Sequence, residues 1–279
     1  MELGMISSTW LGTKIGLEQG IREARRIGFD TYDIFEDPLD IDDATRKLIK
    51  DTSEEVGLPI RSVVCVAFGL VDFNPSVQRF HVDRCKKYLD MVKEFGSDNL
   101  LLVLGEYIWE QQVIRPEDQW KMGVENVRRL GDHARKLGVR IALELEPFKL
   151  SLLNTVERMA KFLKDVGSPA VMANCDISHL HLAKTPFEEV QKLKGKIAHV
   201  HLSDCDGKVH GDLPPGRGCT PIKEYLAAVA KTGFDGVVSI ELEYSPAPDK
   251  IVEWVTEAYR ETDKIMRALK VRDGVVKGK

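Results

Sequence analysis

Ile141-Ala142-Leu143-Glu144 is a short apolar run that ends in a side chain able to bind a metal, and three later stretches repeat this arrangement. The repeats are Met172-Ala173-Asn174-Cys175-Asp176, Ala198-His199-Val200-His201 and Val238-Ser239-Ile240-Glu241. Short apolar runs of this kind are typical of buried strands in a parallel sheet. Consecutive strands of a (β/α) barrel end at one shared mouth, where such barrels keep their chemistry. We therefore expect the four endings to converge.

The rest of the chain alternates short β-like runs with longer amphipathic ones, the order expected of βα units around a parallel sheet. Strands are predicted at Leu3–Ser7, Thr31–Phe35, Ile60–Val66, Asn99–Leu104, Val139–Leu145, Ala170–Asp176, Ile197–Leu202 and Val237–Leu242. Among the predicted helices between them are Asp42–Val56, Val77–Phe95, Asp118–Leu137, Asn154–Val166, Ile222–Thr232 and Ile251–Leu269, with a sixth-unit helix near Pro186–Leu193. This pattern predicts an α/β fold, a (β/α)8 TIM barrel with residues 1–279 as a single domain and a frayed tail at 270–279.

Glycine recurs just before the predicted strands, where a helix that ends often needs a left-handed residue. The positions are Gly28, Gly57, Gly96, Gly138, Gly167, Gly195 and Gly233. The turn Gly28-Phe29-Asp30 also recurs as Gly233-Phe234-Asp235, and we interpret the repeat as packing at the bottom of the barrel, not as a ligand site.

Composition excludes several classes of function. The chain has 40 Lys and Arg against 44 Asp and Glu, a net charge of −4, so we expect no nucleic-acid partner. No run approaches the roughly 18 apolar residues that cross a bilayer, and Met1-Glu2-Leu3-Gly4 does not start a secretory signal. We expect a cytoplasmic protein with no membrane partner. The five cysteines fit neither a metal finger nor a disulfide scaffold, so free thiols are expected.

The four strand endings describe an oxygen-rich site for one divalent cation. Its predicted ligands are Glu144, Asp176, His201 and Glu241. Such a set suits Mn²⁺, which we expect, with Mg²⁺ or Co²⁺ as alternatives, whereas structural zinc favours thiolates or more histidines. A cation there would polarise a C=O group and acidify the neighbouring C–H. Glu144 and Glu241 are then the candidate catalytic residues, because carboxylates beside the substrate can remove and return a proton.

Some assignments stay open because alternate residues of a strand share a face. Glu146 lies two residues beyond Glu144, so it is either the ligand in its place or a supporting group, and Glu243 stands in the same relation to Glu241. His199 likewise shares a face with His201. For His199 the alternative is a buried histidine held by hydrogen bonds.

Candidate substrate contacts lie beyond the strand ends. His179 follows the sixth strand, Trp109 lies in the loop after the fourth, and Glu146 follows the fifth. The long loop 203–220 is rich in glycine and proline, and we interpret it as a lid whose Lys208, His210 and Arg217 could hold a hydroxyl, carboxylate or phosphate. An ordinary surface or packing role is the alternative for each of these side chains.

These motifs resemble the sugar phosphate isomerase/epimerase superfamily, the xylose isomerase-like TIM barrels that include ketose 3-epimerases, hydroxypyruvate isomerases and inosose-processing enzymes. The stretch 138–144 is similar to the family strand that ends in a metal-binding, catalytic Glu. Cys175-Asp176-Ile177-Ser178-His179 is similar to the strand in which Asp binds the metal and His contacts substrate. The stretch 199–204 is similar to the strand whose second His is a ligand, and 236–241 to the strand whose Glu is both ligand and acid/base. The resemblance covers nearly the whole chain.

The sequence departs from the ketose 3-epimerases at two places. Those enzymes carry a substrate-binding Arg six residues after the ligand His, and here that position is Gly207, followed by Lys208. Their asparagine-arginine stretch after the strand-five Glu is replaced by Glu146-Pro147-Phe148-Lys149. Both departures concern the substrate and leave the four metal ligands in place.

The leading hypothesis is a divalent-metal-dependent sugar isomerase or epimerase that abstracts a proton next to a carbonyl of a sugar or polyol ketone, through an ene-diolate. The alternative is a lyase of the same superfamily, resembling C-glycoside deglycosidases or dehydratases, that eliminates a leaving group from a keto-sugar. A nuclease on this barrel would need more histidines and a basic groove, and a non-catalytic carbohydrate-binding barrel is a further alternative. The expected partner is a small carbohydrate. We also expect a homo-oligomer, with a small second subunit as the alternative.

Overall fold

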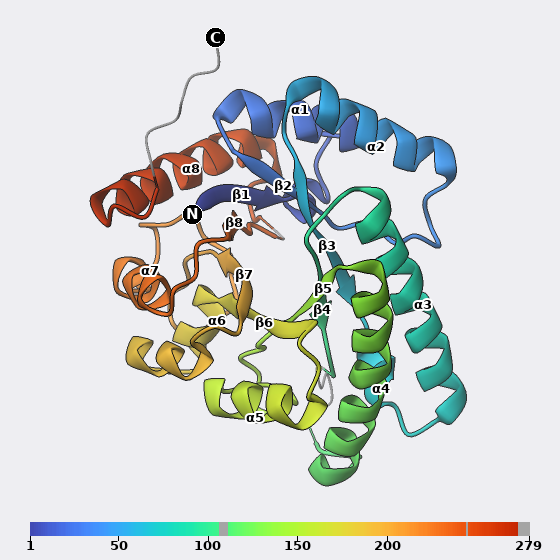
Figure 1. Ribbon diagram of the computed structural model, residues 1–279. Helices are drawn as coiled ribbons and strands as arrows, with labels where there is room; N and C mark the ends of the chain where they lie inside the picture. Colours follow the sequence, from blue (N-terminus) through green and yellow to red (C-terminus); the bar gives the residue numbers. More distant parts are fainter. Residues whose placement is uncertain (106–110, 244, 273–279) are drawn as a thin grey trace.

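The computed structural model describes residues 1–105, 111–243 and 245–272, and eight parallel strands in it close into one barrel surrounded by helices (Figure 1). The strands are β1 Glu2–Ile6, β2 Thr31–Ile34, β3 Ile60–Val66, β4 Asn99–Val103, β5 Arg140–Leu143, β6 Val171–Asp176, β7 Ile197–Leu202 and β8 Val237–Ile240. They follow one another around the barrel in chain order, and β8 pairs with β1. The prediction of a (β/α)8 TIM barrel is confirmed.

Helices follow the strands as the amphipathic pattern predicts. The α-helices are α1 Leu17–Ile27, α2 Asp43–Val56, α3 Pro75–Glu94, α4 Pro116–Leu137, α5 Val156–Val166, α6 Ile177–Leu182, α7 Ile222–Lys231 and α8 Ile251–Ala268. Short 3-10 segments lie at η1 Ser7–Trp10, η2 Phe68–Val71, η3 Phe187–Leu193 and η4 Pro248–Lys250. The glycines predicted to end helices all have positive φ, from 64° at Gly57 to 121° at Gly28.

The sixth unit differs in part from the sequence prediction. The segment predicted as its helix is the 3-10 turn η3, and the α-helix of this unit is α6, directly after β6. Asp176 causes the early start, because its Oδ1 accepts a 2.8 Å hydrogen bond from the backbone N–H of His179 and caps the first turn. One residue therefore ends a strand, caps a helix and stands at the mouth.

Alternate strand residues face the helices and form the main core, while the others point into the barrel. On the β1–β4 side the interior holds a small apolar cluster, formed by Ile6, Val64, Leu101 and Val103. On the β5–β8 side it holds buried polar groups, among them Asn174, His199 and Ser239. This asymmetry gives the barrel interior a polar half that leads to the predicted site.

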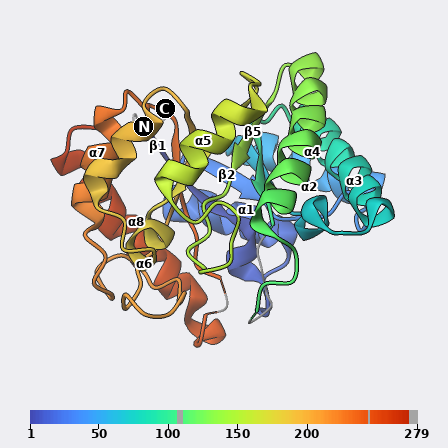
Figure 2. The same cartoon turned by 90° about the horizontal axis from the view of Figure 1, so that it is seen from below.

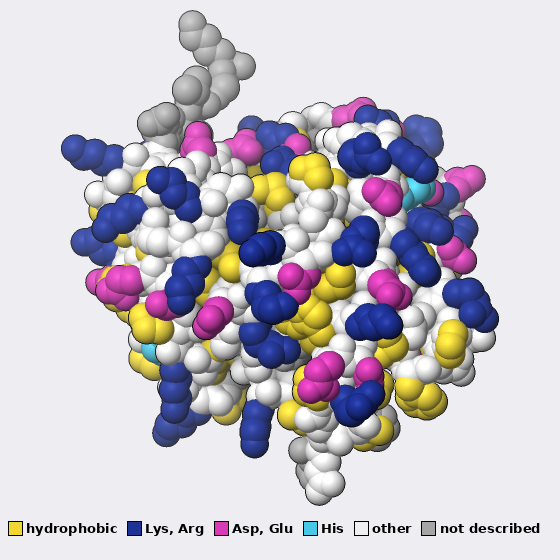
Figure 3. All heavy atoms as spheres, turned by 60° about the horizontal axis from the view of Figure 1, so that its bottom comes forward, with side chains coloured by type: hydrophobic (Ala, Val, Ile, Leu, Met, Phe, Trp, Pro, Cys, Tyr) yellow, Lys and Arg dark blue, Asp and Glu magenta, His cyan; other side chains and the backbone are white. Residues whose placement is uncertain are grey.

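The long connection from β7 to α7 extends from the end of the barrel opposite the N-terminus (Figure 2). Lys and Arg side chains are interspersed with Asp and Glu on the face presented in Figure 3. All five cysteines are free, and only Cys219 among them is exposed. Within the described residues, no helix combines the length and apolar character that a membrane crossing needs. Most of the predicted tail, 273–279, lies outside the described residues.

Candidate metal centre at the barrel mouth

The structure brings the four predicted ligands together. Glu144 follows β5, Asp176 ends β6, His201 lies in β7 and Glu241 follows β8. Asp176, His201 and Glu241 offer ligand atoms that lie within 4.8 Å of one another, and Glu144, Asp176 and His179 form a second such group. His201 Nδ1 joins the two groups, since it lies 3.1 Å from Glu241 Oε2 and 3.9 Å from Glu144 Oε2.

The strand ladder fixes the direction of both glutamates. The backbone N–H of Glu144 donates to the Leu102 carbonyl at 3.0 Å, and that of Glu241 donates to the Leu202 carbonyl at 3.1 Å. The sheet pattern thus continues one residue past β5 and β8. Because side chains alternate along a strand, Glu144 and Glu241 point into the barrel mouth.

Several buried atoms of this cluster lack a hydrogen bond to any described residue. Asn174 Nδ2 donates to Glu144 Oε2 at 2.7 Å, which leaves Glu144 Oε1 without a hydrogen bond. Asp176 Oδ1 accepts from Ser178 Oγ, while Asp176 Oδ2 and His201 Nε2 have no hydrogen-bond partner. Buried polar atoms are nearly always hydrogen-bonded. Carboxylate oxygens that lack a hydrogen bond, on residues whose ligand atoms lie close together, are what a divalent cation would complete.

The electrostatics of the cluster also favour a bound cation. Burial raises the pKa of Glu241 well above its usual range, and the nearby carboxylates of Glu243 and Asp176 raise it further. Burial also acts to raise the pKa of Asp176, but the histidines His179 and His201 outweigh it and hold that pKa at about 2. Burial lowers the pKa of His201, so its imidazole is neutral and able to bind a metal. Crowded carboxylates in a buried site cost free energy unless a cation neutralises them.

His179 faces the mouth and contacts a second histidine, His210. Its Nδ1 lies 2.7 Å from the Leu145 carbonyl oxygen and 3.9 Å from Glu146 Oε2. Its Nε2 lies 2.5 Å from Nε2 of His210, in the loop after β7. Burial opposes a charge on His179, yet Asp176, Glu146 and Glu144 hold its pKa well above the usual value. The structure thus places His179, His210 and Glu146 beside the metal-ligand cluster.

One other predicted substrate contact is engaged elsewhere. Arg217 forms a bidentate ion pair with Glu257 of α8, at 2.9 and 2.6 Å, and lies 4.5 Å over the Trp254 ring. Lys208 is exposed, and its side chain makes no hydrogen bond or ion pair within the described residues. Trp109 lies outside the described residues.

Two supporting residues were not assigned a role from sequence. Asn174 holds Glu144, and the two-residue alternation with Asp176 could have revealed its inward position. Asp204 organises the loop after β7. Its Oδ2 accepts from the backbone N–H groups of Gly216 and Gly218, each at 2.9 Å, and its Oδ1 accepts from those of Cys205 and Thr220. No periodicity in the sequence indicates these hydrogen bonds to Asp204.

His199 forms a separate buried network one layer below His201. Its Nε2 lies 2.8 Å from Asp33 Oδ2, which also accepts a short hydrogen bond from Ser239 Oγ. The two histidine rings meet edge to face, with centroids 5.4 Å apart. Asp33, His199 and His201 also offer ligand atoms within 4.8 Å of one another. The arrangement agrees with the alternative in which His199 is a buried, hydrogen-bonded histidine.

Comparisons with known proteins agree with this geometry. The family model described as xylose isomerase-like TIM barrel matches residues 21–264. Fructoselysine 3-epimerase from Escherichia coli O157:H7 is 24% identical over 82% of this chain and 86% of its own length. Inosose isomerase from Bacillus subtilis (strain 168) is 27% identical over 62% of this chain and 65% of its own length. These names support an enzyme of the isomerase and epimerase class.

Solved structures show the same fold. A crystal structure of IOLI protein with a binding zinc atom superposes with a TM-score of 0.80 at 23% sequence identity. The superposition covers 96% of this chain and 99% of that one.

Proposed function

The chain belongs to the xylose isomerase-like TIM-barrel family, and from this membership and the geometry of the mouth we propose that it is a divalent-metal-dependent sugar isomerase or epimerase. The observation that carries the proposal is the convergence of Glu144, Asp176, His201 and Glu241 with orphaned ligand atoms among them. The names of the relatives, a fructoselysine epimerase and an inosose isomerase, support a ketone of a sugar or polyol as substrate.

Glu144, Asp176, His201 and Glu241 would hold the cation. Their three carboxylates and one imidazole suit Mn²⁺, which we propose, ahead of Mg²⁺ or Co²⁺. The zinc atom named for the IOLI structure supports a divalent ion in a barrel of this shape. When bound, such an ion polarises neighbouring substrate oxygens and makes the adjacent C–H more acidic.

Glu144 and Glu241 would move the proton. They come from β5 and β8, which are separated around the barrel by β6 and β7, so the two carboxylates approach the mouth from different sides. Epimerisation needs a proton removed from one face of a carbon and returned to the other, and two positioned carboxylates can do this.

Contacts to the substrate hydroxyls would come from His179, Glu146 and His210. All three lie beside the cluster, and His210 is the predicted loop contact that reaches it. Arg217 is paired with Glu257 of α8, so we assign it no substrate contact.

The test is hydrogen exchange with solvent. The purified protein is incubated in ²H₂O with a panel of ketoses and inososes, with and without Mn²⁺, and deuterium incorporation is read by NMR. We expect Mn²⁺-dependent exchange at a carbon next to the carbonyl, abolished in Glu241→Gln. Absence of exchange with every member of the panel would overturn the proposal. Release of a second product molecule would instead favour the lyase alternative.

A further inference from the structure

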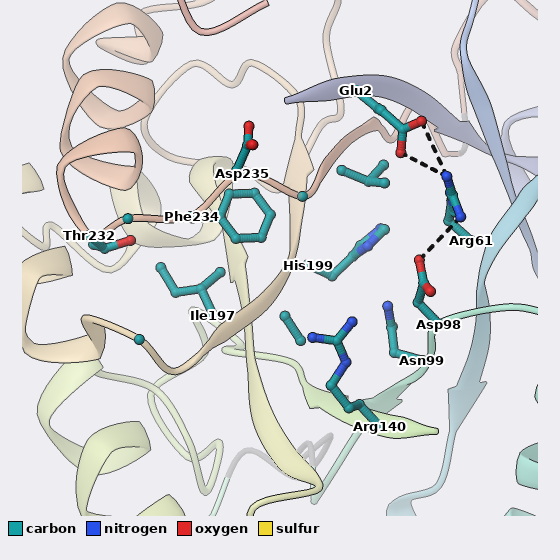
Figure 4. Close-up of a pocket in the computed structure, with 15 residues that line it drawn as sticks. Glu2, Arg61, Asp98, Asn99, Arg140, Ile197, His199, Thr232, Phe234 and Asp235 are labelled. Carbon is teal, nitrogen blue, oxygen red and sulfur yellow. Dashed lines mark hydrogen bonds and ion pairs between the residues drawn. The ribbon is translucent and has the colours of Figure 1, made fainter. Parts of the chain in front are cut away.

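A cavity opens at the end of the barrel opposite the mouth (Figure 4). Its volume is about 480 Å³, which is within the range of small-molecule pockets. Its walls are the first residues of several strands and the turn that precedes β8. That turn is Gly233-Phe234-Asp235, the one interpreted from sequence as packing alone.

Arg140 supplies the free charge of this cavity. It is the first residue of β5 and shares the inward face of that strand with Ala142 and Glu144. Figure 4 shows its guanidinium directed into the cavity. The Arg140 side chain forms no ion pair or hydrogen bond with any described residue, although a guanidinium has five N–H donors in a planar fork.

The acidic groups around Arg140 are already engaged. Glu2 and Asp98 both pair with Arg61, at 3.3 and 3.6 Å. Asp235 accepts from the N-terminal ammonium group of Met1 at 2.8 Å. Among the described residues, Arg140 is therefore the arginine of this cavity that forms no ion pair with a carboxylate.

A donor and apolar walls complete the cavity. Asn99 Oδ1 accepts from Ser62 Oγ at 2.9 Å, so its amide nitrogen remains as a donor on the wall. The Phe234 ring and Ile197 supply apolar surface, and His199 lines the inner end. One free guanidinium, an amide donor and a short apolar wall are suited to a small organic molecule that carries an anionic group.

We propose that this cavity is a second binding site, for a small organic anion whose carboxylate or phosphate group is bound by Arg140. The guanidinium fork matches both groups, because each offers two oxygens to paired N–H donors. The site does not depend on the proposed reaction at the mouth, since none of the predicted metal ligands lines it.

The test is calorimetric titration of the Mn²⁺-loaded protein with two probes, inorganic phosphate and D-gluconate, which separate a phosphate from a carboxylate ligand. We expect at least one probe to bind with a Kd of about 1 mM or tighter. Arg140→Ala is expected to weaken binding about tenfold or more, and Arg140→Lys to fall between it and the native protein. Glu241→Gln, at the mouth, is expected to leave the affinity unchanged.

The matched control is Arg129→Ala, which removes an exposed arginine of α4 whose side chain forms no ion pair with another described residue. Circular dichroism confirms that the Arg140 variants are folded. If neither probe binds the native protein, or if Arg140→Ala binds as the native protein does, the second site does not exist. Loss of binding in Glu241→Gln but not in Arg140→Ala would place the anion at the mouth and overturn the proposal as well.

Discussion

The imidazoles of His179 and His210 meet nitrogen to nitrogen, with 2.5 Å between their Nε2 atoms. His179 stands in α6, directly behind the end of β6, and His210 belongs to the loop between β7 and α7. A hydrogen bond between two nitrogens needs one donor and one acceptor, so a single proton lies between the rings. This contact holds the loop between β7 and α7 against His179, whose position is set by the end of β6.

We expect His210→Ala to raise KM about tenfold with a smaller change in kcat, because it removes a hydrogen-bonding group from the rim without touching the metal ligands. Steady-state kinetics on the substrate identified by hydrogen exchange measures this. His181→Ala is the control, since His181 also belongs to α6 but lies 3.5 Å from the Cys219 thiol, not against His179. Equal effects in both variants would show that the loop contact has no part in substrate binding.

The sequence predicted the barrel and its mouth because both depend on periodicity. Alternation along a strand places Glu144 inward whatever the loops do, and the same holds for Asp176 and His201. The short helix α6 was missed because six residues are too few to show a helical period. The N-cap residue Asp176 is the one feature of the sequence that indicates this helix.

Loop residues could not be placed from sequence. Arg217 looks like an anion contact in isolation, yet its partner Glu257 lies 40 residues further along the chain on α8. Asp204 accepts hydrogen bonds from backbone N–H groups. Because such groups do not depend on the type of residue, the sequence gives no sign of this pairing. Such pairings arise only when the chain is folded.

Asp204 gives a prediction about stability. Its buried carboxylate accepts from backbone N–H groups on both sides of the loop, so Asp204→Asn turns an NH₂ group toward donors and leaves buried groups unpaired. We expect a loss of about 3 kcal/mol in the free energy of unfolding, measured by urea denaturation. Asp206→Asn is the control, because Asp206 accepts from Lys208 and Val209 in the same loop but is exposed. Its loss should stay below about 1 kcal/mol; a larger loss than for Asp204→Asn would contradict this account.

Comparison of Glu144→Gln with Glu146→Gln tests which glutamate of the fifth unit is the metal ligand. Asn174 donates to Glu144 Oε2, so in Glu144→Gln the amide oxygen keeps that bond and the NH₂ group faces the cluster. An NH₂ group cannot bind a cation, and we expect Mn²⁺ affinity to fall about 100-fold or more. Glu146→Gln should cost about tenfold, since Glu146 lies beside His179 instead. Mn²⁺ titration followed by electron paramagnetic resonance measures both, and the reverse order would assign the ligand to Glu146.

Proton release on metal binding is the last prediction. In the metal-free protein, burial and the neighbouring carboxylates of Glu243 and Asp176 hold the pKa of Glu241 well above its usual range. Glu241 therefore keeps its proton at pH values where an exposed glutamate has lost it, and a cation must displace that proton. Asp176, with a pKa of about 2, is already ionised there. Apparent Mn²⁺ affinity should consequently rise with pH until Glu241 ionises without help, and level off above that point.

Calorimetric titration of Mn²⁺ in two buffers of different ionisation enthalpy counts the protons released. At a pH below the raised pKa of Glu241 we expect a net release that disappears in Glu241→Gln, because the amide has no proton to lose. Asp249→Asn, in η4 and exposed, removes a carboxylate that is not one of the ligands and should leave the release unchanged. Release that persists in Glu241→Gln would mean that another group gives up its proton to the cation, and Glu241 would then not be the buried acid that the metal displaces.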